Sequence, residues 1–309
     1  MLSELYGSLR VFGPYRPLLR LPFTLATLWG IHTSMSPPTP PPAEDELEEK
    51  RSGPQKTSPS NKKAKTDNGF MVRFREGILL KLLPLVVKRI FHVFVSIELA
   101  FALLQVFNSN PSSPSTRRFI KFLTPATHSS VDRWTYITDV LQPTPQLILG
   151  TVLALSGGLI RRACYAAMRE MFTFELSIRK EHKLVTWGPY AYLRHPGYTA
   201  AIMAGSGTLL ALVVGRGSWS RECLWPMIAS AFRTLFSGNQ TPPLGLEPVR
   251  TLDFDMPVTI SVLINAIFLA LVIFGPRARK EDEMMEREFG NDWRNWRKRV
   301  RWGLLWGVY

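Results

Sequence analysis

Long apolar stretches recur along the chain and predict helices that cross a membrane. Four blocks carry them, at residues 78–107, 145–160, 198–215 and 257–275. A spanning helix needs about 20 apolar residues, within a range of about 17 to 25. The second and third blocks are short, so whether they cross fully is left open here. Lys81, Lys88 and Arg89 restrict the apolar core of the first block to residues 90–107. The pattern predicts an all-α, multi-span integral membrane protein with about four transmembrane helices.

One acidic residue, Glu98, falls inside the first apolar block. A lone carboxylate in lipid is costly, and intramembrane acids usually face a protein interior or a wet cavity. Glu98 is therefore either a functional carboxylate in such a setting or a residue near the end of its helix. The sequence leaves both interpretations open.

The polar and apolar pattern also divides the chain. Residues 1–31 are poor in acids, and arginines are spaced among Leu, Phe and Trp. This pattern fits a transit-like segment, an interfacial helix or a poorly defined start of the chain. Residues 32–77 begin with a long run of Pro, Ser, Thr, Lys and Glu and predict a disordered linker, because such a segment buries too little apolar surface to fold. Residues 78–309 form the predicted membrane domain.

Charge orients the predicted helices. The chain carries 38 Lys and Arg against 24 Asp and Glu, a net charge of +14. Eight basic residues lie in 50–75, seven in 161–197 and nine in 276–309, whereas 108–144 and 216–256 hold four each. The positive-inside rule then places both termini and the 161–197 segment in the cytosol. These positive charges face anionic membrane lipid, and no basic region has the pattern of a nucleic-acid reader.

Cysteine chemistry adds little. The two cysteines, Cys164 and Cys223, are too few for a disulfide framework or a zinc ribbon. Neither has a His or an acid at catalytic spacing, so no metal site and no thiol nucleophile is predicted.

The segment "KLVTWGPYAYLRHPGYTA", residues 183–200, joins a stiff loop to the third apolar block. Prolines are favoured at the first position of a helix, so Pro196 is expected to begin this span with His195 as its cap. A helix N-terminus beside Arg194 is a natural anion site. The alternative is an interfacial role, with Arg194 and His195 as anchors and the tyrosines as an aromatic belt.

A second charged segment directly follows the last span. Residues 277–289 predict a cytosolic C-terminal helix ended by Gly290, on which Arg277 and Glu281 share a face. The alternative is a solvated helix with weak ion pairs. Four tryptophans that lie among arginines are interpreted as interfacial anchors of the tail: Trp293, Trp296, Trp302 and Trp306.

Taken together, these two segments resemble a known family. "FTFELSIRKEHKLVTWGPYAYLRHPGYTA", followed after a span by "RARKEDEMMEREFGNDW", is similar to the isoprenylcysteine carboxyl methyltransferases and to the wider membrane methyltransferase family that includes phospholipid N-methyltransferases. The resemblance covers roughly residues 147–300. The pair of glutamates usual before Phe-Gly reads Glu281-Asp282 here.

The resemblance, not the spacing, implies the roles of individual residues. Arg277 would contact the prenylcysteine substrate. That Arg194 is catalytic, by helping Arg277 to steer the substrate carboxylate, is a hypothesis added here and is not implied by the resemblance. The cofactor, S-adenosylmethionine, would be bound by Glu175, His182, Lys183, Leu184, Val185, Tyr190, His195, Pro196, Gly197, Tyr198 and Glu281.

The implied activity is transfer of a methyl group from S-adenosylmethionine to the C-terminal carboxylate of a prenylated cysteine, giving a methyl ester. The implied partners are prenylated CaaX-type proteins, and the implied location is the endoplasmic reticulum membrane. Two alternatives remain: a phospholipid N-methyltransferase, and a catalytically silent membrane protein of the same fold. A carboxylate is already ionised at pH 7 and needs no general base, whereas an amine must first lose a proton.

Overall fold

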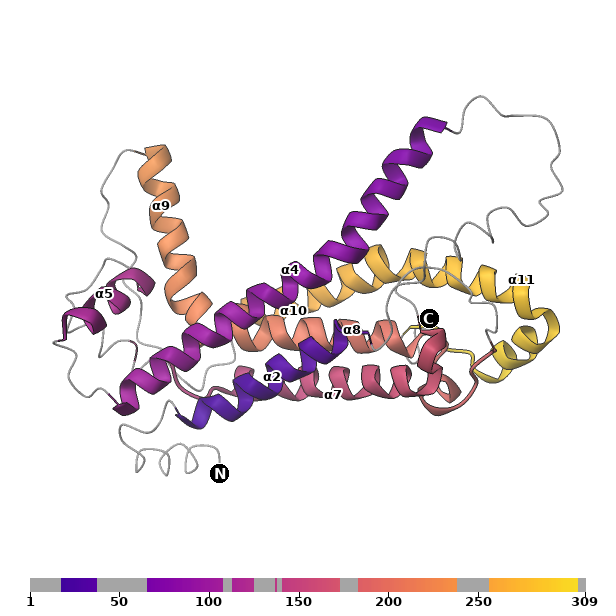
Figure 1. Ribbon diagram of the computed structural model, residues 1–309, viewed down its shortest axis with the longest axis horizontal. Coiled ribbons are helices and arrows are strands. Elements are labelled where there is room, and N and C mark those ends of the chain that lie inside the picture. The colour runs from indigo at the N-terminus through magenta and orange to yellow at the C-terminus, as the bar shows by residue number, and fades with distance from the viewer. Residues whose placement is uncertain are drawn as a thin grey trace. The chain divides into compact units, whose positions relative to one another are not determined.

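The structure is a computed structural model that describes residues 18–37, 66–107, 113–124, 137, 141–172, 183–237 and 256–304. These residues form helices, with no strand among them (Figure 1). The α-helices are α2 (Leu21–Ser34), α4 (Thr66–Phe107), α5 (Pro114–Leu123), α7 (Pro145–Met168), α8 (Pro196–Thr208), α9 (Trp225–Ser237), α10 (Met256–Phe268) and α11 (Gly275–Arg299). Short helical turns are η2 (Arg169–Met171), η3 (Gly188–Ala191), η4 (Leu209–Val214), η5 (Ser220–Leu224) and η6 (Leu269–Phe274).

Four of these helical stretches are long and apolar enough to cross a membrane. They are Pro84–Phe107, Pro145–Met171, Pro196–Val214 and Ile260–Arg299. The prediction of a helical multi-span membrane protein is confirmed. The second block, short in the sequence, becomes 27 residues because the helix continues through Arg161 and Arg162 to Met171. Buried Arg161 is accommodated by its neighbours rather than ending the span.

Helix boundaries differ from the predicted domain limits. α2 continues past residue 31 to Ser34, and α4 begins at Thr66, ahead of the predicted domain start at residue 78. Of the predicted linker, residues 38–65 lie outside the described part of the chain, as do residues 1–17 of the N-terminal segment. The linker stays a prediction for those residues.

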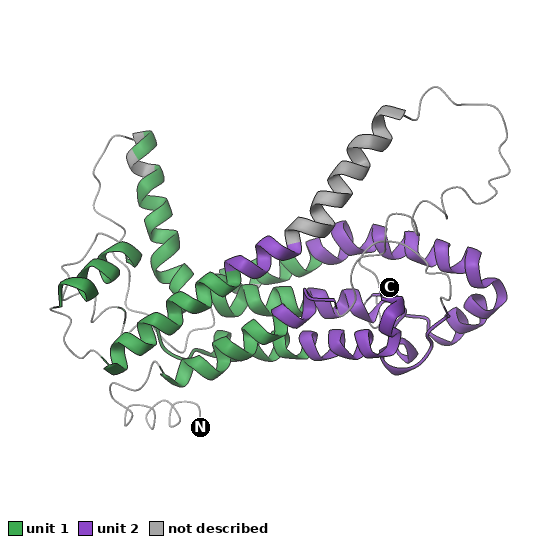
Figure 2. Ribbon diagram, viewed as in Figure 1, with its two compact units in different colours: residues 1–31, 91–156, 203–267 green, residues 32–90, 157–202, 268–309 purple. Residues whose placement is uncertain are grey.

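The chain divides into two compact units, each made of separate segments (Figure 2). Unit 1 comprises residues 1–31, 91–156 and 203–267, and unit 2 comprises residues 32–90, 157–202 and 268–309. Unit 1 holds most of the apolar helix packing. Unit 2 holds both segments that the sequence singled out for chemistry.

Small residues bring helices together in unit 1. A Cβ atom on Gly150 of α7 would lie 2.6 Å from the carbonyl oxygen of Gly207 in α8. Without side chains at these positions the backbones approach closely, as is common where membrane helices pack. Around this contact, Val95, Leu147, Ala211 and Leu212 form a buried apolar cluster.

Glu98 is a buried carboxylate with a structural role in unit 1. It is 4% exposed and accepts hydrogen bonds from Arg20 Nε at 3.0 Å and Arg20 Nη2 at 3.1 Å. The backbone N–H of Trp219 donates to the same carboxylate at 3.1 Å. The ion pair ties the start of α2 to α4, so the described end of the N-terminal segment is part of the packed unit.

The core of unit 2 corrects the interpretation of two tryptophans. Trp293 and Trp296 are 1% and 5% exposed and pack with Val300 against Leu184, Tyr190, Met285 and Phe289. They are buried in protein and are not membrane anchors. The interpretation failed because the flanking arginines suggested a surface helix, whereas their spacing of three places both indoles on one buried face.

Gly290 explains how α11 can supply that face. It has φ 50° and ψ −113°, in the left-handed region that favours glycine, and it kinks the helix. The predicted stop after Phe289 is thus a kink, and a second helical segment continues to Arg299.

Candidate active site

The loop before α8 is fixed by the end of the chain that the structure describes. The backbone N–H of Arg194 donates to the carbonyl of Trp302 at 2.9 Å, and that of His195 donates to the carbonyl of Gly303 at 3.0 Å. The Thr199 hydroxyl donates to the carbonyl of Leu304. The His195 bond satisfies one of the N–H groups that the start of a helix leaves unpaired. Residues 302–304 therefore hold the N-terminus of α8 in place.

His195 lies between two carboxylates from α11. Its Nε2 is 2.9 Å from Asp282 Oδ1, and its Nδ1 is 3.6 Å from Glu281 Oε2. Burial by itself lowers the pKa of His195, but the two carboxylates outweigh it and raise that pKa to about 9. The imidazole is consequently a cation at neutral pH, and it joins the loop to α11.

Tyr198, one turn further along α8, connects two charged residues of opposite sign. Its hydroxyl donates to Glu281 Oε2 at 2.7 Å and accepts from Arg277 Nε at 2.9 Å. Its ring stacks on His195 at 5.7 Å and on Phe274 at 5.1 Å between ring centroids. The predicted shared face of Arg277 and Glu281 is present, and Tyr198 is the residue that both contact.

Arg194 is buried at 7% exposure, and its guanidinium contacts the protein itself. Nη1 donates to the carbonyl of Arg301 at 2.7 Å, and Nη2 lies 3.3 Å from Asp282 Oδ2. Asp282 thus binds Arg194 and His195 through its two oxygens. This geometry fits a positioning residue better than one that meets a substrate.

Arg161 of α7 explains the glycine at position 197. A Cβ atom on Gly197 would lie 2.6 Å from Arg161 Nη1. Arg161 is itself 4% exposed, donates to the Tyr165 hydroxyl at 3.0 Å, and lies over the ring of Phe172 at 5.0 Å from its centroid. The small residue after Pro196 therefore lets a buried cation approach the N-terminus of α8.

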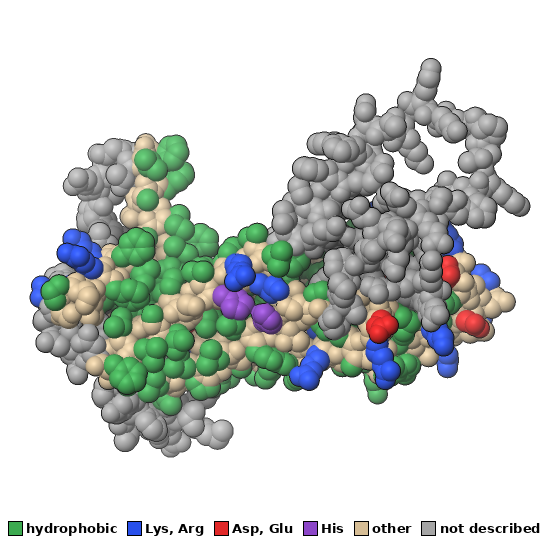
Figure 3. Space-filling view, viewed as in Figure 1, with side chains coloured by type: hydrophobic (Ala, Val, Ile, Leu, Met, Phe, Trp, Pro, Cys, Tyr) green, Lys and Arg blue, Asp and Glu red, His purple; other side chains and the backbone are tan. Residues whose placement is uncertain are grey.

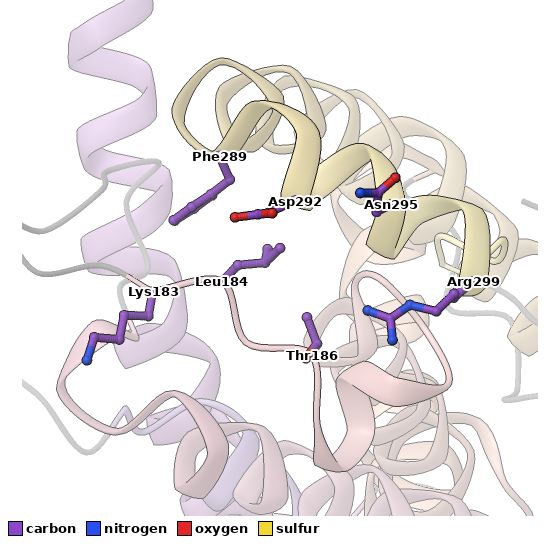
Figure 4. Close-up of a pocket in the computed structure, with 7 residues that line it drawn as sticks. All are labelled: Lys183, Leu184, Thr186, Phe289, Asp292, Asn295 and Arg299. Atoms are coloured by element: carbon purple, nitrogen blue, oxygen red, sulfur yellow. The ribbon is translucent and has the colours of Figure 1, made fainter.

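A cavity of about 580 Å³ lies in unit 2 between the 183–186 segment and α11 (Figure 4). Its lining residues are Lys183, Leu184, Thr186, Phe289, Asp292, Asn295 and Arg299. The volume falls within the range of about 300 to 1,000 Å³ typical of small-molecule sites. The lining offers an aromatic ring, a carboxylate, an amide and cations.

Buried donors occur beside this cavity. The indole N–H groups of Trp293 and Trp296 have no hydrogen-bond partner among the described residues. These tryptophans pack against Leu184 and Phe289, which line the cavity. Unpaired buried donors are uncommon in folded proteins. Both indole nitrogens are inaccessible to solvent, and neither tryptophan is among the residues that line the cavity.

The predicted site residues fall into four groups. His195, Tyr198, Glu281, Arg194 and Arg277 share one network; Lys183 and Leu184 line the cavity. Val185, Pro196 and Gly197 are buried, and Tyr190 packs in the tryptophan cluster, its hydroxyl 2.8 Å from Met168 Sδ. Glu175 and His182 lie outside the described residues.

Sequence reasoning missed two residues that the structure connects to this site. Asp282 was noted only as a departure from the family pattern, although its place next to Glu281 was a signal. Arg161 gave a weaker one, a basic residue within an extended apolar helix. No sequence signal indicated the cavity residues after Gly290, because the predicted helix ended there.

The fold and the network define a class of protein: a multi-span helical membrane protein with a buried array of charged residues. This array joins the start of α8 to α11. Residues 148–217 match the model of the isoprenylcysteine carboxyl methyltransferase (ICMT) family. This confirms the resemblance over that stretch, which includes Arg194 to Tyr198 and ends before Arg277.

Two curated rice proteins are similar to part of the chain. Both are named "Probable protein-S-isoprenylcysteine O-methyltransferase", from Oryza sativa subspecies indica and japonica, and each is 35% identical over 66 residues. The aligned part covers 21% of this chain and 35% of each relative. The chain therefore matches about a third of the length of these relatives. No solved structure matches it.

Proposed function

We propose that this protein is an S-adenosylmethionine-dependent methyltransferase that esterifies the C-terminal carboxylate of prenylated cysteine. One observation carries the proposal: the Tyr198 hydroxyl binds both Arg277 and Glu281, and so unites the two sequence segments on which the family resemblance rests. The match to the family model supports the same conclusion from the first segment alone.

The residues of unit 2 fit the cofactor. The cavity beside Leu184 has suitable size, its Asp292 and Asn295 suit hydroxyl and amine groups, and Phe289 offers an aromatic face. When bound, S-adenosylmethionine supplies an electrophilic methyl group on a positively charged sulfur.

Arg277 is the residue assigned to the substrate. It is half-buried, and its Nε is fixed by the Tyr198 hydroxyl, which orients the guanidinium. An oriented guanidinium suits a carboxylate, which it can hold through two parallel hydrogen bonds. The substrate carboxylate is ionised at pH 7, so the protein has to align it and exclude water and does not have to remove a proton.

Three further residues help to position Arg277 without meeting the substrate: Arg194, Asp282 and His195. Asp282 holds Arg194 and His195, and His195 in turn faces Glu281. Glu281 fixes Tyr198, so the chain of contacts ends at Arg277. We therefore assign Arg194 to positioning, and Arg277 to substrate contact.

The proposal includes setting and partners. The substrates are prenylated CaaX-type proteins, whose lipid tails reside in the bilayer, and the protein lies in the endoplasmic reticulum membrane with both termini in the cytosol. Methylation removes a negative charge from a lipidated C-terminus and strengthens its attachment to the membrane.

A methyl-ester assay tests the activity. Membranes containing the full chain are incubated with labelled S-adenosylmethionine and farnesylcysteine or geranylgeranylcysteine analogues, and base-labile label is measured. We expect labelled ester with the prenylated analogues and none with free cysteine. Arg277→Ala should abolish it, whereas Arg279→Ala, at an exposed position of the same helix, should retain it.

The outcomes separate the alternatives. Base-stable label in phospholipid would indicate a phospholipid N-methyltransferase. An absence of label in both fractions would indicate a catalytically silent protein. Equal turnover by the Arg277 and Arg279 variants would contradict the site assignment and leave the activity standing.

A further inference from the structure

The helix α9 of unit 1 has an exposed surface that the proposed reaction does not use. α9 carries large apolar side chains that the described part of the chain leaves uncovered: Trp225, Ile228, Phe232, Leu235 and Phe236 are 50%, 48%, 60%, 80% and 75% exposed. Figure 2 shows α9 as a unit 1 helix that projects from the rest of that unit, and Figure 3 shows hydrophobic side chains along it.

These side chains form one stripe. Their spacing of three and four residues places them on a single face of a helix. Ser230 lies on the other side of the helix and is exposed. The sequence of α9, "WPMIASAFRTLFS", contains one basic residue and no acid. The stripe is a contiguous exposed apolar patch, whereas an ordinary protein surface exposes apolar side chains singly.

The start of α9 is fixed at the end of a membrane span. The third span ends at Val214, and α9 follows directly after η5. The Ser220 hydroxyl donates to the carbonyls of Leu212 and Val213, both at 2.7 Å, and Arg221 Nη1 donates to the carbonyl of Val214 at 2.7 Å. These bonds hold η5 against the last turn of the candidate span, so the start of α9 is fixed close to the end of that span.

We infer that α9 lies in the membrane interface, with its apolar stripe buried among lipid acyl chains. Unit 1 presents a further apolar surface suited to lipid, because α10 exposes Ile260, Leu263, Ile264 and Ile267 on a candidate span. An amphipathic helix with its backbone hydrogen bonds satisfied internally can lie in this layer. Since α9 carries little charge, its contact depends on apolar burial and not on anionic lipid.

Spin-label accessibility tests the inference on the full chain in phosphatidylcholine vesicles. Nitroxides are attached at Leu235→Cys and Phe232→Cys on the stripe, and at Ser230→Cys as the matched control on the same helix. The native Cys164 and Cys223 are buried, and the unsubstituted chain, labelled in parallel, measures their background. The collision rates with oxygen, which concentrates in lipid, and with a water-soluble nickel chelate are compared.

We expect the ratio of oxygen to nickel collision rates to be several-fold higher at positions 232 and 235 than at 230. Adding anionic lipid or salt should leave this difference unchanged. High nickel collision rates at all three positions would place α9 in water. Low rates with both reagents at 232 and 235 would mean that protein, such as a second copy of the chain, covers the stripe. Either result would overturn the inference.

Discussion

The hydroxyl of Tyr198 is the smallest group on which the proposed site depends. It touches a carboxylate on one side and a guanidinium on the other, and it comes from a different segment of the chain from both. Hydrogen bonds to charged groups contribute more than neutral ones, on the order of 1.5 to 3 kcal/mol each. The loss of this one oxygen therefore removes one hydrogen bond from Arg277 and one from Glu281.

Tyr198→Phe keeps the stacked ring and removes the hydroxyl. We expect kcat/KM for the prenylcysteine analogue to fall roughly 10- to 100-fold, because Arg277 is no longer oriented. Steady-state kinetics with labelled ester as product measures the change. Tyr192→Phe, at a 64% exposed position in the preceding loop, is the control and should leave kcat/KM unaltered. Equal effects of the two changes would contradict the role given to the hydroxyl.

His195 makes a pH-dependent contribution to stability. Its pKa of about 9 in the folded protein exceeds the ordinary value of about 6.5, so the folded state binds the proton more tightly. The contribution, on the order of 3 kcal/mol, is complete below about pH 6.5 and is lost as pH rises to about 9. We expect the unfolding midpoint in detergent to fall over this range.

His195→Gln should remove that part of the pH dependence while lowering stability at pH 6.5. Unfolding followed by tryptophan fluorescence from pH 6 to 9.5 compares the two chains. An unchanged slope in the variant would show that other groups titrate in this range.

At the scale of elements, the Arg20–Glu98 pair decides how α2 is attached. Both residues are nearly inaccessible, at 2% and 4% exposure, and Arg20 Nη1 also donates to the carbonyl of Gln142 at 3.1 Å. Breaking a buried ion pair by removing one partner costs about 3 to 5 kcal/mol, because the other charge stays buried. This pair therefore joins α2, α4 and the start of α7.

Arg20→Met and Glu98→Gln should each lower the free energy of unfolding by about 3 to 5 kcal/mol. The double variant should lose much less than the sum, since neither charge is left alone. Denaturation in detergent micelles gives the three values. Arg118→Met, at an exposed position of α5, is the control and is expected to be near neutral. Additive losses would mean that the pair does not couple the two helices.

At the scale of the whole molecule, the four candidate spans and the distribution of Lys and Arg together predict the topology. An even number of spans returns the chain to its starting side. Residues 216–256, with four basic residues against nine in 276–309, would lie on the opposite side.

Epitope accessibility in cells checks this orientation. An epitope placed after residue 309 should bind antibody once the plasma membrane alone is permeabilised. An epitope inserted between residues 245 and 246 should need full permeabilisation, because the proposed topology puts this segment on the lumenal side. The reverse result would invert the topology, and equal accessibility would mean that one span does not cross.

Several features were readable from the sequence because they depend on local composition. The apolar blocks predicted four spans, and Pro196 marked the start of the third, where the structure has it. The helical spacing of Arg277 and Glu281 placed them on one face. Such features require only helix periodicity and the preference of apolar segments for lipid.

Other features depended on which segments meet in space. Nothing local to Tyr198 indicates Arg277, nothing near Glu98 indicates Arg20, and the arginines around Trp293 and Trp296 suggested exposure where the structure has burial. A charge costs free energy when it is buried alone and is tolerated when it is paired, so its role is set by its partner. The sequence by itself determined the four apolar spans, the membrane setting and the family resemblance; only the tertiary structure decided which charges pair and which aromatic residues are buried.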